Sequence, residues 1–374
     1  MYLEPRQRRR RRASLWPWAL SVIVAFGVAW YLYTRQTAIL ETVRGPLPTP
    51  TPTEISPTEH TALGDKLFLQ GHYDEAIARY SRATELDPSQ ASAYARWGRI
   101  MALRLKHAEA QRLARRAVEL DAESAENQAI LGMVLDWGGL VSEAIGACLR
   151  ATQIAPDYSL GYACLAEAYG DYGRVDEAYA MAQKAVELNP DDLFARRNLG
   201  YMYELMGRYR DAIREYETAV ALNPNQAFLY LDLGRNYRVL NEMQEAAYQF
   251  ERAIQVDPGN VYAHAQLGWT YYTEGLYRPA ADELLRAIEV DPDYAPAYGQ
   301  LGVVYYVQRN YEEAIVYFEQ AIAVGGATEE LCYMLGFCYA YLDRCDEARP
   351  LFEQALAINA FSTLAQQGLA YCNR

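Results

Sequence analysis

Residues 193–226 read LFARRNLGYMYELMGRYRDAIREYETAVALNPNQ, and this stretch of 34 residues decides the fold. Leu199 and Tyr203 lie four residues apart, so they share one face of a first helix. Gly207 ends that helix, and small and aromatic residues then recur every three to four residues along a second one. The second helix ends before Pro224, because proline cannot continue a helix. The stretch therefore predicts two antiparallel helices joined by a short turn.

The same unit recurs without insertion or deletion over residues 57–362, as nine repeats numbered here 1 to 9. The eighth position of successive repeats is small: Gly64, Gly98, Gly132, Ala166, Gly200, Gly234, Gly268, Gly302 and Gly336. The twentieth is always alanine: Ala76, Ala110, Ala144, Ala178, Ala212, Ala246, Ala280, Ala314 and Ala348. Small residues at these positions let two helices approach closely. The sequence predicts an all-α solenoid of nine 34-residue helix-turn-helix repeats, with a capping helix over residues 363–374.

This period and pattern resemble those of the tetratricopeptide repeat family over residues 57–362. The resemblance implies a right-handed α-solenoid whose concave groove binds a peptide or helix of a partner protein. It also implies that positions 2, 5, 9, 12 and 13 of each first helix line this groove. In repeats 5 to 9 these positions combine aromatic residues with arginine, a composition typical of binding hot spots. The residues expected in the groove are Arg197, Tyr201, Glu204, Arg235, Arg238, Trp269, Tyr272, Tyr306, Phe337 and Tyr341.

Two interpretations of these groove residues stay open. Arg235, Arg238, Trp269 and Tyr272 belong to the adjacent repeats 6 and 7, so they are expected to form one contiguous concave patch. With 32 tyrosines in the chain, however, some aromatic residues are expected only to pack between neighbouring first helices.

The N-terminal region predicts a membrane anchor. Residues 1–12 are basic, and the uncharged residues 13–34 would span about 33 Å as a helix with aromatic residues at both ends, which predicts a transmembrane helix. Six arginines precede this helix and two follow it, so residues 1–12 are expected in the cytoplasm and the repeats outside the cell membrane. A cleaved signal peptide, a twin-arginine export signal and cytoplasmic repeats are the alternatives.

Residues 35–56 form a Pro/Thr-rich linker between this helix and the first repeat. Proline alternates with other residues in the segment from Gly45 to Pro57, which favours a semi-rigid polyproline II spacer of about 40 Å.

Charge and motifs exclude several classes of function. Residues 57–374 carry 27 Lys and Arg against 45 Asp and Glu, which argues against binding of nucleic acid. The four histidines lie far apart and have no cysteine or carboxylate partners at metal-ligand spacing. Phosphate-binding loops and nucleophile motifs are also missing. The sequence therefore predicts no enzyme, no cofactor and no metal site.

The function expected from these features is that of a membrane-anchored scaffold or adaptor that binds a partner protein in its groove. The alternative is a non-catalytic regulatory subunit of a membrane enzyme complex, such as that of a glycosyltransferase.

Export to an oxidising compartment would permit disulfides among the six cysteines. Cys345 stands at the start of a second helix, and Cys372 stands at position 10 of the following helix. Antiparallel packing brings these positions together, which predicts a bridge that clamps the capping helix, with Cys338 as the rival partner of Cys345. Cys148 and Cys164 are expected to be free thiols.

Overall fold

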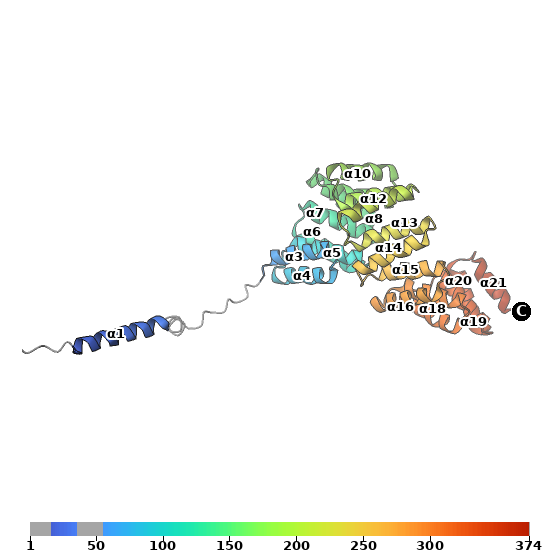
Figure 1. Ribbon diagram of the computed structural model, residues 1–374. Helices are drawn as coiled ribbons and strands as arrows, with labels where there is room; N and C mark the ends of the chain where they lie inside the picture. The colour runs from blue at the N-terminus through green and yellow to red at the C-terminus, as the bar shows by residue number, and fades with distance from the viewer. Residues whose placement is uncertain (1–15, 36–54, 374) are drawn as a thin grey trace, which may run out of the picture. The chain divides into compact units, whose positions relative to one another are not determined.

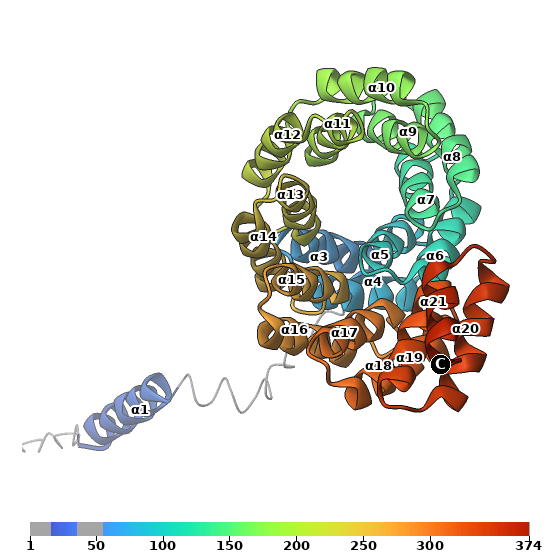
Figure 2. The same ribbon diagram turned by 90° about the vertical axis from the view of Figure 1, so that its right-hand side faces the viewer.

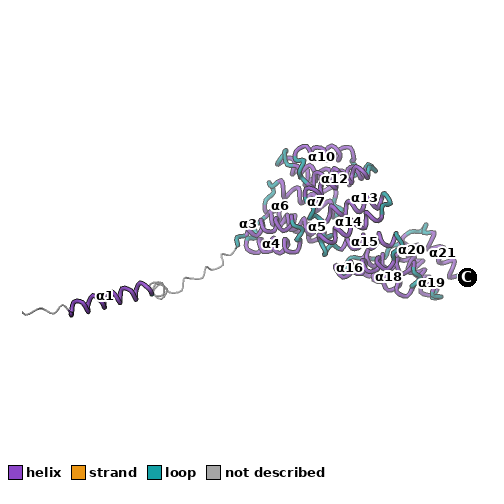
Figure 3. Tube along the Cα trace, in the orientation of Figure 1, coloured by secondary structure: helices purple, strands orange, loops and turns teal. Residues whose placement is uncertain are grey.

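The computed structural model describes residues 16–35 and 55–373. Within these residues the regular secondary structure is helical, and no strand is present (Figure 3). The chain divides into two compact units, residues 1–55 and residues 56–374.

The first unit contains helix α1 (Trp16–Thr34), which has 19 residues. At about 1.5 Å per residue α1 is about 28 Å long, slightly less than the hydrocarbon thickness of a bilayer. No described helix is both long and apolar enough to cross a membrane. The first three residues of the predicted transmembrane segment 13–34, the basic segment 1–12 and most of the predicted linker lie outside the described residues.

The second unit consists of nine helix pairs and a final helix (Figure 1). The first helices of the repeats are α3 (Pro57–Leu69), α5 (Ala91–Leu103), α7 (Ala125–Trp137), α9 (Ser159–Asp171), α11 (Leu193–Leu205), α13 (Ala227–Val239), α15 (Val261–Thr273), α17 (Ala295–Val307) and α19 (Glu329–Tyr341). The second helices are α4 (Tyr73–Leu86), α6 (His107–Leu120), α8 (Val141–Ile154), α10 (Val175–Leu188), α12 (Tyr209–Leu222), α14 (Met243–Val256), α16 (Tyr277–Val290), α18 (Tyr311–Gly325) and α20 (Cys345–Ile358). The capping helix is α21 (Thr363–Cys372).

Each repeat turns between its two helices at one residue with a positive φ. Glycine takes this position in five repeats, as at Gly207 with φ 71°. Leu105 and Arg309, which depart from the glycine pattern, both adopt φ 61°. The packing of the two helices therefore imposes the turn even where the local sequence disfavours it.

In five repeats the glycine at position 8 is needed because the second helix places an aromatic ring against it. A Cβ added at Gly200 would lie 2.8 Å from Cε1 of Tyr216, and one added at Gly234 would lie 2.5 Å from Cε1 of Phe250. Both rings are fully buried. This contact sets the spacing of the two helices within a repeat.

Some repeats also contact repeats that are not their neighbours in sequence. The superhelix closes on itself within its first six repeats, so that repeat 1 meets the end of repeat 5 (Figure 2). The Tyr73 hydroxyl donates to Oε1 of Gln226 at 3.1 Å, across 153 residues of sequence. Gln226 Nε2 donates to the carbonyl of Phe68 at 3.0 Å, and Asn223 Nδ2 donates to the carbonyl of Leu69 at 3.2 Å. Repeat 1 thereby packs against the junction between repeats 5 and 6.

Two ion pairs join the turn between α5 and α6 in repeat 2 to the ends of repeats 6 and 7. Arg104 binds Asp257 at 2.7 Å and also pairs with Asp74. Lys106 binds Asp291 at 2.7 Å, across 185 residues. We call the turn of superhelix formed by α3 to α14 the ring; helices α15 to α21 continue the solenoid beyond it (Figure 2).

Candidate functional site

The ten residues expected in the groove lie on the first helices of repeats 5 to 9. Arg197, Tyr201 and Glu204 on α11, with Arg235 and Arg238 on α13, belong to the ring. Trp269 and Tyr272 on α15, Tyr306 on α17, and Phe337 and Tyr341 on α19 belong to repeats 7 to 9. Arg235 lines a cavity inside the ring, whereas Trp269 lines a pocket beside α17.

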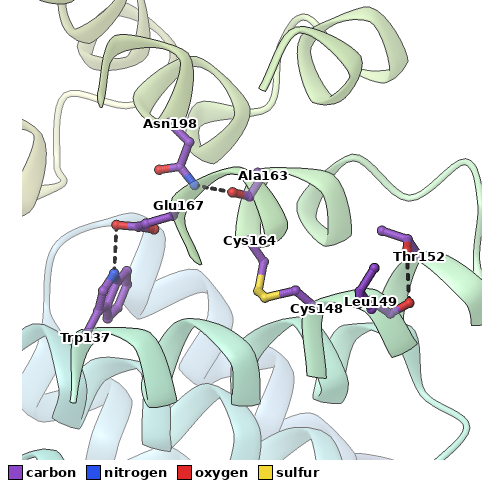
Figure 4. Close-up of a disulfide and its surroundings, with 8 residues drawn as sticks. All are labelled: Trp137, Cys148, Leu149, Thr152, Ala163, Cys164, Glu167 and Asn198. Carbon is purple, nitrogen blue, oxygen red and sulfur yellow. Dashed lines mark hydrogen bonds between the residues drawn. A yellow bond between two sulfur atoms is a disulfide. The ribbon is translucent and has the colours of Figure 1, made fainter. Parts of the chain in front are cut away.

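Inside the ring, Arg197 is held by the protein's own carboxylates. Its side chain is 11% exposed, pairs with Glu167, and binds Asp232 at 2.8 Å. Trp137 Nε1 donates to the same Glu167 carboxylate at 2.9 Å (Figure 4). Arg235 binds the other oxygen of Asp232 at 2.8 Å. These charges neutralise one another, so a partner would have to break existing pairs to reach them.

Tyr201 and Glu204 on α11 form hydrogen bonds within the chain, whereas the buried Nη1 of Arg238 on α13 has no hydrogen-bond partner among the described residues. The Tyr201 hydroxyl donates to Asp171, and burial together with this bond raises the pKa of Tyr201. Glu204 accepts hydrogen bonds from the hydroxyl of Tyr216 at 3.0 Å and from Asn236 Nδ2 at 2.7 Å. Burial lowers the pKa of Arg238, whose guanidinium lies 5.9 Å from the centroid of the Phe250 ring.

Side chains fill much of the opening between the helices that Figure 2 shows at the centre of the ring. The Arg99 guanidinium of repeat 2 lies 4.5 Å from the ring centroid of Phe68 and 5.4 Å from that of Phe194 in repeat 5. Phe194 stacks on Phe228 at 5.5 Å. A cavity of about 330 Å³ remains, lined from both sides by Leu103, Trp137, Arg197, Phe228, Arg235 and Tyr262. The interior of the ring therefore resembles a packed core more than an open groove.

The aromatic residues expected in the groove of repeats 7 to 9 are partly exposed to solvent. Trp269 stacks on Tyr272 with centroids 4.6 Å apart, and both are half-buried. Tyr306 and Phe337 both contact Tyr341, at 6.3 and 5.8 Å between centroids. Tyr341 is 42% exposed. We call Trp269, Tyr272, Tyr306, Phe337 and Tyr341 the aromatic surface.

An apolar pocket of about 580 Å³ lies next to this surface, between α17, α18 and α19. It is lined by Trp269, Pro296, Gly299, Val303, Leu331 and Met334, among others. Several of these residues occupy the first-helix positions expected to line the groove: Pro296, Gly299 and Val303 stand at positions 2, 5 and 9.

Two features of repeat 8 accompany the pocket. Helix α18 has 15 residues, one more than the other second helices, and ends in Gly325 before Gly326, which has φ 84°. Where most repeats have Asp-Pro or Asn-Pro, repeat 8 has this pair of glycines. In addition, Gly299 on α17 lines the pocket and places no side chain in it. Sequence reasoning missed Gly299, Leu331 and Met334, although the double glycine is a visible signal.

Two disulfides are present among the described cysteines. Cys345 and Cys372, the pair expected from the sequence, are bonded with their Cα atoms 5.4 Å apart. Cys148 and Cys164, which were expected to be free, are also bonded (Figure 4). The prediction for this second pair is wrong because position 6 is buried despite its usually polar residues: Cys164 is 2% exposed. Gly132 leaves room for the bridge, since a Cβ there would lie 2.4 Å from the Cys148 sulfur.

Comparison with known families agrees with the repeat architecture. Family profiles described as tetratricopeptide repeat or TPR repeat match residues 64–102, 162–192, 181–214, 206–261, 240–302, 295–324 and 329–361. Together these matches cover more than half of the chain. The chain belongs to the tetratricopeptide repeat family. Curated protein sequences give no significant match.

Solved structures share the fold of this tetratricopeptide repeat protein at low sequence identity. A chain of the APC/C hetero-tetramer Cut9-Hcn1 superimposes with a TM-score of 0.67 and 15% identity, over 86% of this chain and 64% of that one. PilW, described as a widely conserved type IV pilus biogenesis factor, gives a TM-score of 0.52 and 19% identity over 56% of this chain and 98% of PilW. Pseudomonas aeruginosa pilF gives a TM-score of 0.51 and 18% identity, over 57% of this chain and 96% of pilF. At these identities the similarity shows the fold alone.

Proposed function

We propose that this protein is a scaffold that binds a segment of a partner protein on the concave face of repeats 7 to 9. The observation that carries the proposal is the aromatic surface beside an apolar pocket. Aromatic side chains combine a large apolar area with a polar tip, and they dominate binding energy where they line a pocket. The proposal leaves Arg197 and Arg235 out of the binding surface, because their charges are already paired with Glu167 and Asp232 of the same or adjacent repeats.

Replacement of Trp269 tests this assignment once a crosslinking pull-down has identified the partner. Trp269→Ala should weaken partner binding at least tenfold, because it removes a stacked ring from the pocket wall. Its circular dichroism and melting should change little, since the residue is only half-buried. Tyr248→Ala is the matched control, because Tyr248 is 57% exposed on the second helix α14. Equal losses of binding in both variants, or a large loss of stability in Trp269→Ala, would contradict the proposal.

We further propose that the N-terminal segment 1–34 attaches the protein to a membrane and that the repeats lie in an oxidising compartment. The two disulfides support the second part, because disulfides persist where the environment is oxidising. The arginine run before an apolar segment and the exposed apolar side chains of α1, such as Ile23 and Phe26, support the first. Alkaline phosphatase fused after Arg374 should be active. Activity from a cytoplasmic reporter only, fused at the same place, would contradict the export.

A further inference from the structure

The wall of the apolar pocket in repeats 8 and 9 has a defined chemistry. Its larger side chains are apolar, including Trp269, Val303, Leu331 and Met334. Gly299 lies in the middle of α17, where a glycine costs helix stability relative to alanine and where its missing side chain widens the pocket. A cavity of about 580 Å³ is large enough for a bulky aliphatic or aromatic side chain together with part of its backbone.

The polar groups of this pocket are mostly acceptors. The Oε1 atom of Gln300 is buried and accepts no hydrogen bond from the residues that the structure describes. The carboxylate of Glu330 is exposed and forms no ion pair with any residue in the described ranges. No lysine, arginine or histidine lines the pocket. The enclosed Gln300 oxygen is out of reach of a ligand, but a ligand that brings positive charge would satisfy the exposed carboxylate of Glu330.

The charge of the whole repeat region points the same way. Residues 57–374 carry 45 acidic against 27 basic side chains, so a cationic segment is attracted and an acidic one repelled. In the ring, by contrast, the carboxylates Glu167 and Asp232 already have arginine partners. Glu330 is therefore a carboxylate at a cavity that is available to an incoming cation.

We propose that this pocket selects partner segments in which a bulky apolar residue is flanked by lysine or arginine. The apolar side chain enters between α17 and α19, and a flanking cation pairs with Glu330. This inference rests on the proposed function and adds the chemistry of the partner to it. An acidic segment would place its carboxylates against Glu330 with no cation in the pocket wall to pair with.

Three capped hexapeptides titrated calorimetrically into the full chain in mild detergent test the selection: KGWLGK, its acidic counterpart EGWLGE, and KGAAGK without the apolar pair. KGWLGK should bind at least tenfold more tightly than either of the others. Glu330→Gln should reduce the preference for KGWLGK over EGWLGE at least threefold. Equal affinities for the three peptides, or no binding of any of them at millimolar concentration, would overturn the inference.

Filling the pocket gives a second, matched test. Gly299→Leu should weaken KGWLGK at least tenfold, whereas Gly299→Ala should change it less than threefold. Gly299→Ala should fold, because a Cβ at Gly299 makes an ordinary contact at 3.4 Å with Leu331. Gly299→Leu should fold because the cavity of about 580 Å³ has room for the longer side chain; melting curves check both variants. Unchanged binding by a folded Gly299→Leu variant would also overturn the inference. If Trp269→Ala abolishes binding of the natural partner while Gly299→Leu does not, the inference fails and the proposed function stands.

Discussion

At the scale of single residues, Asp136 on α7 is a carboxyl group that the fold keeps from water. It is 4% exposed, and neither of its oxygens accepts a hydrogen bond from a described residue. Burial, together with the nearby carboxylates of Glu167 and Asp171, raises the pKa of Asp136 to about 9. In an unfolded chain the same group has a pKa of about 3.9. Asp136 is therefore protonated at neutral pH in the folded state and ionised in the unfolded state.

Because the folded state holds a proton that the unfolded state releases, Asp136 makes the protein less stable as the pH rises from about 4 to about 9. Asp136→Asn removes this cost and should raise the free energy of unfolding by about 1–3 kcal/mol at pH 8. The gain should be smaller at pH 5.5, where the cost is smaller. Urea unfolding at the two pH values measures the difference. Asp346→Asn is the control, because its side chain is 94% exposed; a gain for Asp136→Asn that is the same at both pH values would contradict the assignment.

Residues at position 6 show where sequence reasoning at this scale reaches its limit. The small residues at positions 8 and 20 identify the repeat because steric contact permits few alternatives there. Polar residues at position 6 suggest exposure, yet Asn198 is fully buried and donates to the carbonyl of Ala163 at 2.7 Å. A polar side chain with a satisfied hydrogen bond can be buried, and its type alone does not reveal this. The error at Cys164 has the same origin.

At the scale of elements, the capping helix α21 depends on contacts made by its last turn. It has only 10 residues, and the disulfide from Cys372 to Cys345 ties it to the start of α20. Arg349 donates to the carbonyl of Cys372 at 2.9 Å, and Gly368 packs closely against the ring of Phe352. A terminal helix of a solenoid has a neighbour on one side only, so such attachments decide whether it frays.

Cys345→Ser should therefore loosen α21 more than any other helix. Removal of a disulfide that closes a loop of this length costs about 3 kcal/mol. Hydrogen exchange should accelerate in α21 and the end of α19, while exchange in the ring stays unchanged. Cys148→Ser is the matched control, because its bridge joins α8 to α9, far from α21 in the sequence. Equal protection of α21 in the two variants would show that the Cys345–Cys372 bridge does not hold the cap.

The pocket could be anticipated from the sequence only in part. Gly325-Gly326 in place of Asp-Pro or Asn-Pro and Gly299 within α17 mark repeat 8 as irregular. The volume between α17 and α19, however, depends on how far the two helices separate, which no local pattern determines. The aromatic residues of repeats 7 to 9 were found because the repeat fixes which first-helix positions share a face.

At the scale of the whole molecule, the closure of the ring could not be predicted. A repeat pattern specifies contacts between neighbours, and the pitch of the superhelix arises from small rotations that accumulate over several repeats. Contacts such as that from Tyr73 to Gln226 join residues 153 positions apart that share no local pattern. Closure also explains why the expected groove residues of α11 and α13 face a packed interior.

Arg104 is the ion-pairing residue whose loss should open the ring most clearly. Its partner Asp257 is 2% exposed, so Arg104→Ala leaves a buried carboxylate without its cation. The variant should lose about 3 kcal/mol of stability, and amide exchange should accelerate in α3, α4 and α5. Arg115→Ala is the control, because its pair with Glu143 has both side chains about half exposed and joins adjacent repeats. Similar small effects of the two substitutions would indicate that the ring closure adds little stability.

The central claim is that partners bind on the concave face of repeats 7 to 9. Site-specific photo-crosslinking in cells tests it most directly, with p-benzoylphenylalanine in place of one exposed tyrosine of the full chain. Tyr341 is 42% exposed on the aromatic surface and Tyr248 is 57% exposed on α14, so the two positions match in residue type and accessibility. The account predicts a discrete adduct with one partner protein from position 341 and none from position 248. The same adduct from position 248, with none from position 341, would contradict it.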